Sequence, residues 1–243
     1  MRCITDKEGD MAGRLVTLMT CLMAGLLLSA CSPSEVDQRK AFIAFLQTDV
    51  LPKQGARMPQ PNAEKLKPFG DYAGHYAVIT RFHERMNNSV ANPMQEAMAK
   101  GMPRSIEEVV TRKADIAAVR AGFVKMKEAL DQAAAAADAE RAALKQPDDL
   151  ASVYGATYDK LVTQPVATFR EIFPPTDEAF GAVLAMAELI EANRPAIKLS
   201  GSQIEISNAA LRSKVQVAMT AMAAKQRSMV EAQQKLRRLV YGS

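Results

Sequence analysis

Apolar residues recur every three or four positions along most of the chain, which is the spacing of one face of an α-helix. Prolines and glycines divide this pattern into segments, and several segments follow a residue that can cap a helix. The pattern predicts helices over residues 35–50, 69–90, 93–100, 105–145, 147–163, 165–173 and 177–193, and a last helix that Ser207 or Asn208 caps and that ends near Val240. The chain is therefore predicted to be mainly α.

The two longest predicted helices carry apolar stripes with near-heptad spacing. The first begins at a capping box formed by Ser105 and Glu108 and continues to Lys145. A helix as long as the last one cannot leave such a stripe in water. If the cover is intramolecular, the best partner is the other long stripe, Ile116 to Leu144, in antiparallel contact; otherwise the stripe is an intermolecular surface. The architecture is an elongated antiparallel helical bundle. The stripe of the last helix consists of Leu211, Val215, Met222, Met229 and Leu236.

Other segments interrupt the helical spacing. Several prolines make residues 51–68 an irregular connection with one turn at 63–67, and Pro174-Pro175 is predicted to end the helix before it, with Thr176 capping the next. Between 197 and 206 the spacing changes to two around Ser200-Gly201-Ser202, which predicts one small β-hairpin. A lone hairpin is marginal in water and should lie against the helices.

The first 31 residues have the features of a bacterial lipoprotein signal. Arg14 precedes a mostly apolar run of 14 residues, which is too short for a membrane span. A lipoprotein signal peptidase needs an aliphatic residue three positions before the cut, two small residues, and then a cysteine that carries diacylglycerol. The residues that meet these requirements are Leu28, Ser29, Ala30 and Cys31.

We therefore expect residues 1–30 to be removed as a signal peptide. Asp6, Glu8 and Asp10 are unusual in an export signal, which favours Met11 over Met1 as the true start. The mature chain would consist of a lipidated tether, 31–34, and a single helical periplasmic domain, 35–243. Diacylglycerol and an N-acyl chain such as palmitate on Cys31 would be its membrane anchor.

The predicted mature chain keeps only the lipidated cysteine, so it has no disulfide. Ser32 follows Cys31, and an Asp at that position would retain a lipoprotein at the inner membrane. We therefore expect the periplasmic face of the outer membrane. The net charge of +4 is mild, and a periplasmic address makes nucleic acid an implausible partner.

Two blocks of sequence resemble the YiaF-like family of Gram-negative lipoproteins. The first is Asp37-Gln38-Arg39-Lys40-Ala41-Phe42-Ile43 and its continuation to Gln47. The second joins Leu144-Lys145-Gln146 to Asp148-Asp149-Leu150 and then Leu161-Val162-Thr163. The resemblance implies a lipoprotein with a domain of unknown function, and it implies no catalytic residues.

Few side chains suggest chemistry. Met94, Met98 and Met102 are four residues apart, and thioethers select Cu(I) or Ag(I), so they are candidate ligands of a soft metal; core packing is the stronger interpretation. His75 and His83 are two helical turns apart, which suits surface or interface positions better than one metal site. The sequence contains no nucleophile elbow, phosphate-binding glycine loop or Cys-x-x-Cys pair.

We therefore expect a lipid-anchored cell-envelope protein that binds or assembles with another envelope component and is not an enzyme. The predicted partners are the membrane, the lipoprotein processing and sorting machinery, and an envelope protein of unknown identity. No cofactor is expected besides the lipid on Cys31. The alternatives are a periplasmic Cu or Ag binder that uses the methionines, and an envelope enzyme whose site only the fold assembles.

Overall fold

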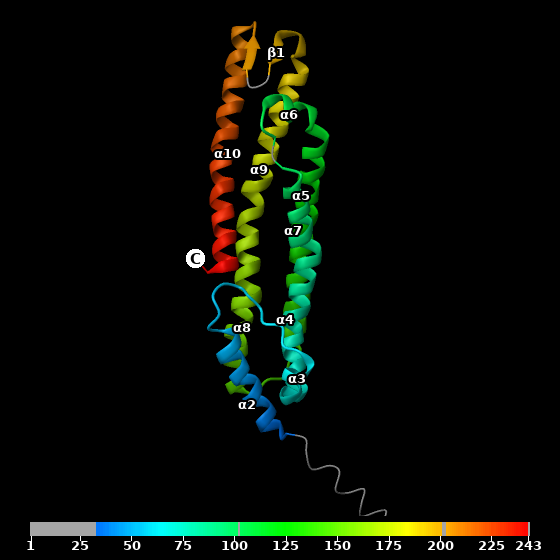
Figure 1. The fold of residues 1–243 in the computed structure, drawn as a ribbon, viewed down its shortest axis with the longest axis vertical. Coiled ribbons are helices and arrows are strands. Elements are labelled where there is room, and N and C mark those ends of the chain that lie inside the picture. Colours follow the sequence, from blue (N-terminus) through cyan, green and yellow to red (C-terminus); the bar gives the residue numbers. More distant parts are fainter. Residues whose placement is uncertain (1–32, 102, 201–202, 243) are drawn as a thin grey trace, which may run out of the picture.

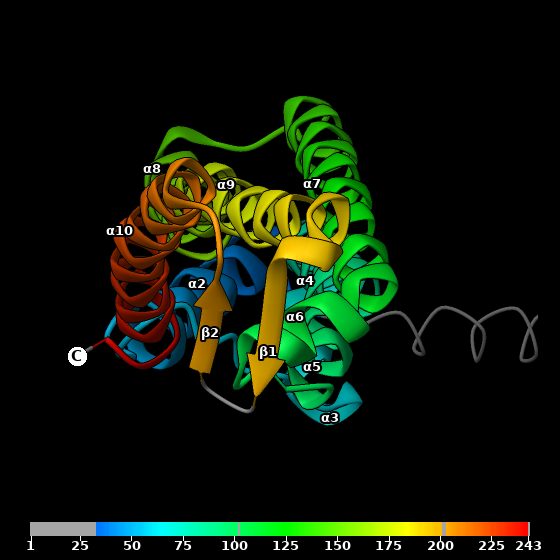
Figure 2. The same cartoon turned by 90° about the horizontal axis from the view of Figure 1, so that it is seen from above.

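The computed structural model describes residues 33–101, 103–200 and 203–242. These residues form an elongated bundle of helices with one small sheet at one end (Figure 1). The prediction of a mainly α, antiparallel bundle with a hairpin is confirmed. Seen along the bundle, the hairpin lies across the ends of the helices (Figure 2).

The order of elements follows the prediction in outline. The first half contains α2 (Glu35–Phe45), a π-helical turn (Leu46–Val50), α3 (Ala63–Leu66), a 3₁₀ segment (Lys67–Tyr72), α4 (Ala73–Met86), a second π turn (Asn87–Ala91) and α5 (Asn92–Ala99). The second half contains α6 (Ile106–Thr111), α7 (Lys113–Ala142), α8 (Asp148–Tyr158), a third π turn (Asp159–Thr163), α9 (Gln164–Ala192), a 3₁₀ turn (Arg194–Ala196), β1 (Ile197–Ser200), β2 (Gln203–Ile206) and α10 (Ala209–Tyr241).

Local capping residues begin several of these helices. Ser105 Oγ accepts a hydrogen bond from Glu108 N at 3.1 Å, and Asn208 Oδ1 accepts one from Leu211 N at 3.1 Å. Ser34 caps α2 in the same way. Each bond satisfies an amide of the first turn that has no partner inside its helix, which is why these starts could be predicted from sequence.

Each π turn ends two residues before a proline, at Pro52, Pro93 and Pro165. In each turn the amide of the residue before the proline donates to the carbonyl five residues back, as Gln164 N does to Asp159 O. A proline ring clashes with the carbonyl four residues earlier in an α-helix, and the wider turn relieves that contact. Helical structure therefore continues past Pro93 and Pro165.

The prediction that Pro174-Pro175 ends a helix is wrong, because α9 continues through both prolines. Thr176 is not a cap; it is buried in mid-helix, and its hydroxyl donates to Ile172 O at 2.8 Å. The helix is held on both sides just after the prolines, where Asp177 bonds to α7 and Glu178 to α10. This tertiary packing outweighs the local loss of two amide donors.

The predicted helix over 105–145 is divided at Arg112, whose backbone angles, φ −102° and ψ 16°, are not helical. The Arg112 side chain turns back to the end of α5 and donates to the carbonyls of Lys100 and Gly101 at 2.9 and 3.1 Å. These bonds satisfy carbonyls that α5 leaves without a partner and fix α6 at an angle to α7.

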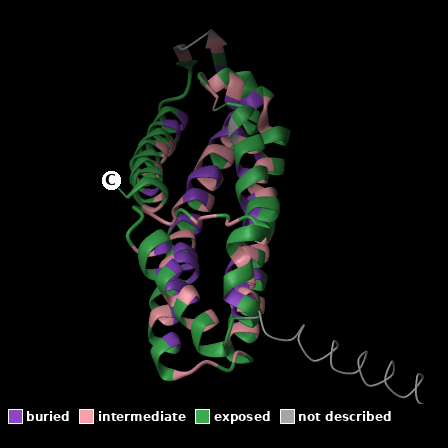
Figure 3. Ribbon diagram, turned by 60° about the horizontal axis from the view of Figure 1, so that its bottom comes forward, coloured by how far each residue is buried: buried purple, intermediate pink, exposed green. Residues whose placement is uncertain are grey.

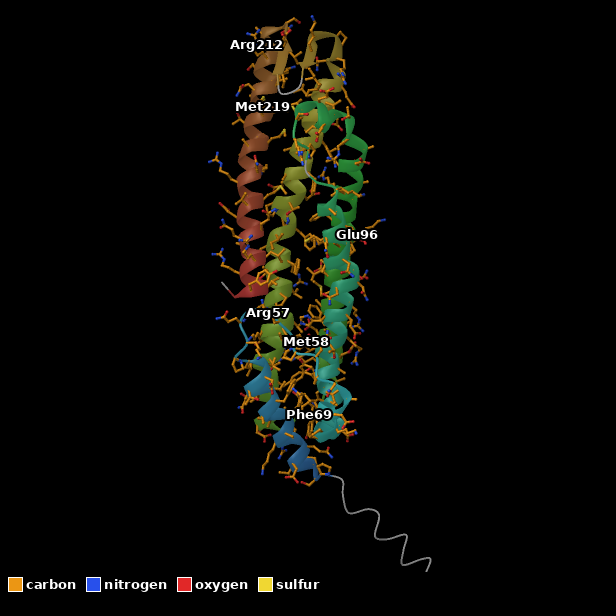
Figure 4. All side chains as sticks on the ribbon, in the orientation of Figure 1. Arg57, Met58, Phe69, Glu96, Arg212 and Met219 are labelled. Atoms are coloured by element: carbon orange, nitrogen blue, oxygen red, sulfur yellow. The ribbon has the colours of Figure 1, made fainter. Side chains whose placement is uncertain are left out.

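The expected partner of the last helix is also wrong, because α10 packs along α9 and not along α7. Its lower end meets the connection that follows the first π turn: Ala56 N donates to Leu239 O at 2.8 Å, and Arg57 lies over the Tyr241 ring at 5.4 Å (Figure 4). Gly55 has φ +65°, and a Cβ there would lie 2.5 Å from Val240 O. Only glycine permits this close approach.

Buried residues, purple in Figure 3, lie on the inner faces of the helices. They form two groups. The larger group extends from α2 along most of α7 and to the middle of α9, and it is rich in aromatic rings. The smaller group lies under the hairpin, whose strands pair Ile197 with Ile206 and Leu199 with Ile204. Its buried members are Val110, Met186, Ile190, Ile197, Leu211 and Val215.

Candidate binding groove

A mainly apolar cavity of about 510 Å³ lies between α5, α7, α9 and α10 and is open on one side. Within the described residues, α10 makes extensive contact with α9 but not with α5 or α7, so the bundle is open along this seam. We call this cavity the groove. Its apolar lining consists of Met94, Ala97, Pro103, Ile116, Val119, Phe123, Ile172, Phe180, Met229, Ala232, Leu236, Val240 and Tyr241.

Aromatic rings make part of the wall of the groove. The Phe123 ring of α7 lies 5.3 Å from Phe180 and 6.3 Å from Phe173, both on α9. Phe123 and Phe180 line the groove, whereas Phe173 is not among its lining residues. All three rings are buried, and the Thr176 hydroxyl donates to a carbonyl of its own helix. This wall therefore offers an incoming molecule mainly apolar surface.

The charged side chains that line the groove are mostly cationic. They are Lys100, Arg112 and Arg237, with Asp115 as the carboxylate. Arg112 is held by the two carbonyls at the end of α5, and its Nη1 lies 3.9 Å from Glu108. Among the residues that the structure describes, neither Lys100 nor Arg237 forms an ion pair with a carboxylate. The groove thus combines apolar walls with a positive border.

His75 lies near the start of α4 and His83 near its end, and both lie between helices. His75 Nδ1 is 3.0 Å from Gln146 Nε2, and the His75 carbonyl accepts a hydrogen bond from Tyr154 Oη at 2.9 Å. Burial lowers the pKa of His75 and of His83. The prediction of interface positions is confirmed, and no group of three His, Cys, Asp or Glu side chains in the described ranges could hold a metal.

The structure describes the side chain of only one of the three candidate methionines. Met94 is buried and lines the groove. The Met98 side chain and Met102 lie outside the description, so the soft-metal site of Met94, Met98 and Met102 stays a prediction.

The lipoprotein signal also stays a prediction. Leu28, Ser29, Ala30 and Cys31 lie outside the described residues. The described chain reaches α2 at the end of the bundle opposite the hairpin (Figure 1). Among the helices that are described, none is long and apolar enough to cross a membrane.

Sequence reasoning missed the groove because it expected the stripe of α10 to be covered. Leu211 and Val215 are buried as expected, but Met222, Met229 and Leu236 are only partly buried. No spacing along the chain signalled this, because the stripe is left open only by the way α10 packs along α9 and not along α5 or α7.

Comparison with known proteins agrees with the resemblance noted in the sequence. The chain is 29% identical over 167 residues to Uncharacterized protein YiaF of Escherichia coli strain K12, which is 68% of this chain and 70% of that protein. YiaF of Shigella flexneri gives the same identity and coverage. No solved structure matches the chain significantly. Residues 18–237 match the model described as Protein of unknown function (DUF3053), and the chain therefore belongs to the DUF3053 family.

Proposed function

We propose that this chain is a lipid-anchored cell-envelope protein that acts by binding a molecule in the groove and not by catalysis. The groove carries this proposal. Its volume of about 510 Å³ falls within the range of roughly 300–1,000 Å³ that small-molecule sites occupy, and its walls are mainly apolar with a few charged groups, as in such sites.

The flexible lining of the groove and its access from the side support binding. The two methionines of the lining, Met94 and Met229, have flexible side chains that adapt to an occupant. The open seam between α5 and α10 gives access from the side of the bundle. A cavity held open between packed helices is a preferred place for ligand sites in bundles.

The anchoring part of the proposal rests on the sequence from Leu28 to Cys31. Lipidation at Cys31, followed by Ser32 in place of the Asp that would retain the protein at the inner membrane, would place the chain at the periplasmic face of the outer membrane. Its partners would be the processing and sorting machinery and another envelope component. Because α2 starts three residues after Ser32, a short tether would hold this end of the bundle near the membrane.

Anchoring is tested by replacing the lipidated cysteine. The intact mass of the membrane-extracted wild type should correspond to a chain that starts at residue 31 plus acyl groups. Cys31→Ser should stay unprocessed, whereas Cys21→Ala, a cysteine inside the signal, should be processed normally. A processed, membrane-bound Cys31→Ser protein would overturn this part of the proposal.

Binding is tested with an uncharged hydrocarbon that carries a photoactivatable diazirine. The full lipid-anchored chain in phospholipid nanodiscs should be labelled on groove residues of α5, α7 and α10. Gln233→Trp places an indole in the groove and should abolish this labelling, whereas Gln234→Trp, an exposed neighbour that does not line the groove, should not. Equal labelling of both variants would count against a binding groove.

A further inference from the structure

We infer that the groove takes a single-chain amphiphile with an anionic head group, of the chemical class of a long-chain fatty acid. This inference rests on the proposed function, since it names the ligand of the same groove. It is argued from the apolar walls, the volume and the charge of the border.

The apolar walls suit a hydrocarbon tail. The helices α5, α7, α9 and α10 each contribute apolar side chains, from Met94 at one wall to Leu236 at the other. The Phe123 and Phe180 rings pack on each other behind them. A flexible tail can follow such an irregular channel, and each methylene that leaves water contributes to binding.

The border suits an anion. The Arg112 guanidinium lies against the end of α5, because its Nη2 donates to the carbonyls of Lys100 and Gly101 at 2.9 and 3.1 Å. These bonds fix its position. Its Nη1 lies 3.9 Å from Glu108, beyond hydrogen-bond distance, so it can still donate to the carboxylate of a ligand, which a guanidinium binds well. On the opposite wall Arg237 adds a further positive charge, and among the lining residues that the structure describes Asp115 is the one carboxylate.

The volume suits one acyl chain. The cavity holds about 510 Å³ and runs along several turns of α10, from Met229 to Tyr241. An unbranched acyl chain can occupy this space without moving α10 away from α9. We therefore assign the groove to a lipid-like ligand that is a separate molecule from the acyl chains on Cys31.

The experiment uses the full lipid-anchored chain in nanodiscs of zwitterionic lipid and a palmitic acid analogue with a diazirine at the tail end. Mass spectrometry should locate the adducts on groove residues of α5, α7 and α10. Unlabelled palmitic acid should compete, and palmityl alcohol, which has the same tail without the charge, should compete about tenfold less well. Among shorter fatty acids, each added methylene should tighten binding about fourfold until the groove is filled.

Charge reversal on the border supplies the matched variants. Lys100→Glu and Arg237→Glu, both exposed, should weaken competition by palmitic acid about tenfold and leave competition by the alcohol unchanged. Arg238→Glu, the exposed neighbour that does not line the groove, should behave as the wild type.

The outcomes separate the two proposals. Equal competition by acid and alcohol, or an equal effect of Arg237→Glu and Arg238→Glu, would overturn the anionic head group. Labelling by the uncharged diazirine hydrocarbon without labelling by the fatty acid would refute this inference and leave the binding groove standing. Absence of groove labelling by either probe would refute both.

Discussion

Arg120 of α7 and Asp177 of α9 form a two-point ion pair, with Nε to Oδ1 at 2.7 Å and Nη2 to Oδ2 at 2.9 Å. Asp177 is the second residue after Pro175, so the pair holds α9 where the prolines remove two amide donors. The Arg120 guanidinium lowers the pKa of Asp177 by donating to it.

Breaking this pair should weaken the helix that carries the groove wall. Both side chains are partly exposed, so we expect Arg120→Met and Asp177→Asn each to lower the free energy of unfolding by about 0.5–1 kcal/mol, with a double mutant close to either single mutant. Because the pKa of Asp177 is lowered, the contribution is present above its ordinary pKa and is lost as the pH falls through the lowered one. Urea denaturation of the four proteins measures this, and simple additivity of the two changes would contradict it.

The continuous α9 makes a prediction about its prolines. Pro174 is exposed in mid-helix, and alanine there restores an amide donor and removes the clash with the preceding turn. We expect Pro174→Ala to raise the free energy of unfolding by about 1–3 kcal/mol. Pro147→Ala, before the first turn of α8, is the control and should have little effect. An unchanged or lower stability of Pro174→Ala would contradict a continuous helix.

A charge should destabilise the protein strongly on the inner face of α10 and very little on its outer face. Val215 is 3% exposed under the hairpin and Val217 is 68% exposed. Val215→Asp buries an unpaired carboxylate and should lower the free energy of unfolding by about 3 kcal/mol or more, whereas Val217→Asp should change it by less than about 0.5 kcal/mol. Thermal melts followed by circular dichroism compare the two. A similar loss for both would mean that the outer face of α10 is also covered.

His83 should make stability depend on pH near neutrality. Burial lowers its pKa below the ordinary 6.5, so between the two pKa values the unfolded chain binds more protons than the folded chain. Stability is therefore fully present above about pH 6.5 and falls as the solution becomes more acidic. His83→Leu should reduce this fall, and His75, whose pKa burial also lowers, should account for part of the remainder. Urea midpoints at about pH 7.5 and about pH 5.5 test it; an unaltered difference in His83→Leu would refute it.

The sequence by itself determined the features that depend on neighbours along the chain. The caps at Ser34, Ser105 and Asn208 are such features, because each side chain satisfies amides in its own first turn. The helical class and the hairpin over 197–206 follow from apolar spacing in the same way.

Only the tertiary structure decided how the helices are paired. Pro174-Pro175 does not break α9, because α7 and α10 hold that helix on both sides, and the bonds that hold it come from residues such as Arg120 and Lys225, each over 40 positions away. The stripe of α10 packs on α9 and not on α7, since several apolar faces compete for it and the best fit depends on all of them. The groove arises from the same choice: Met229 and Leu236 are only partly covered because α10 packs along α9 and makes no extensive contact with α5 or α7.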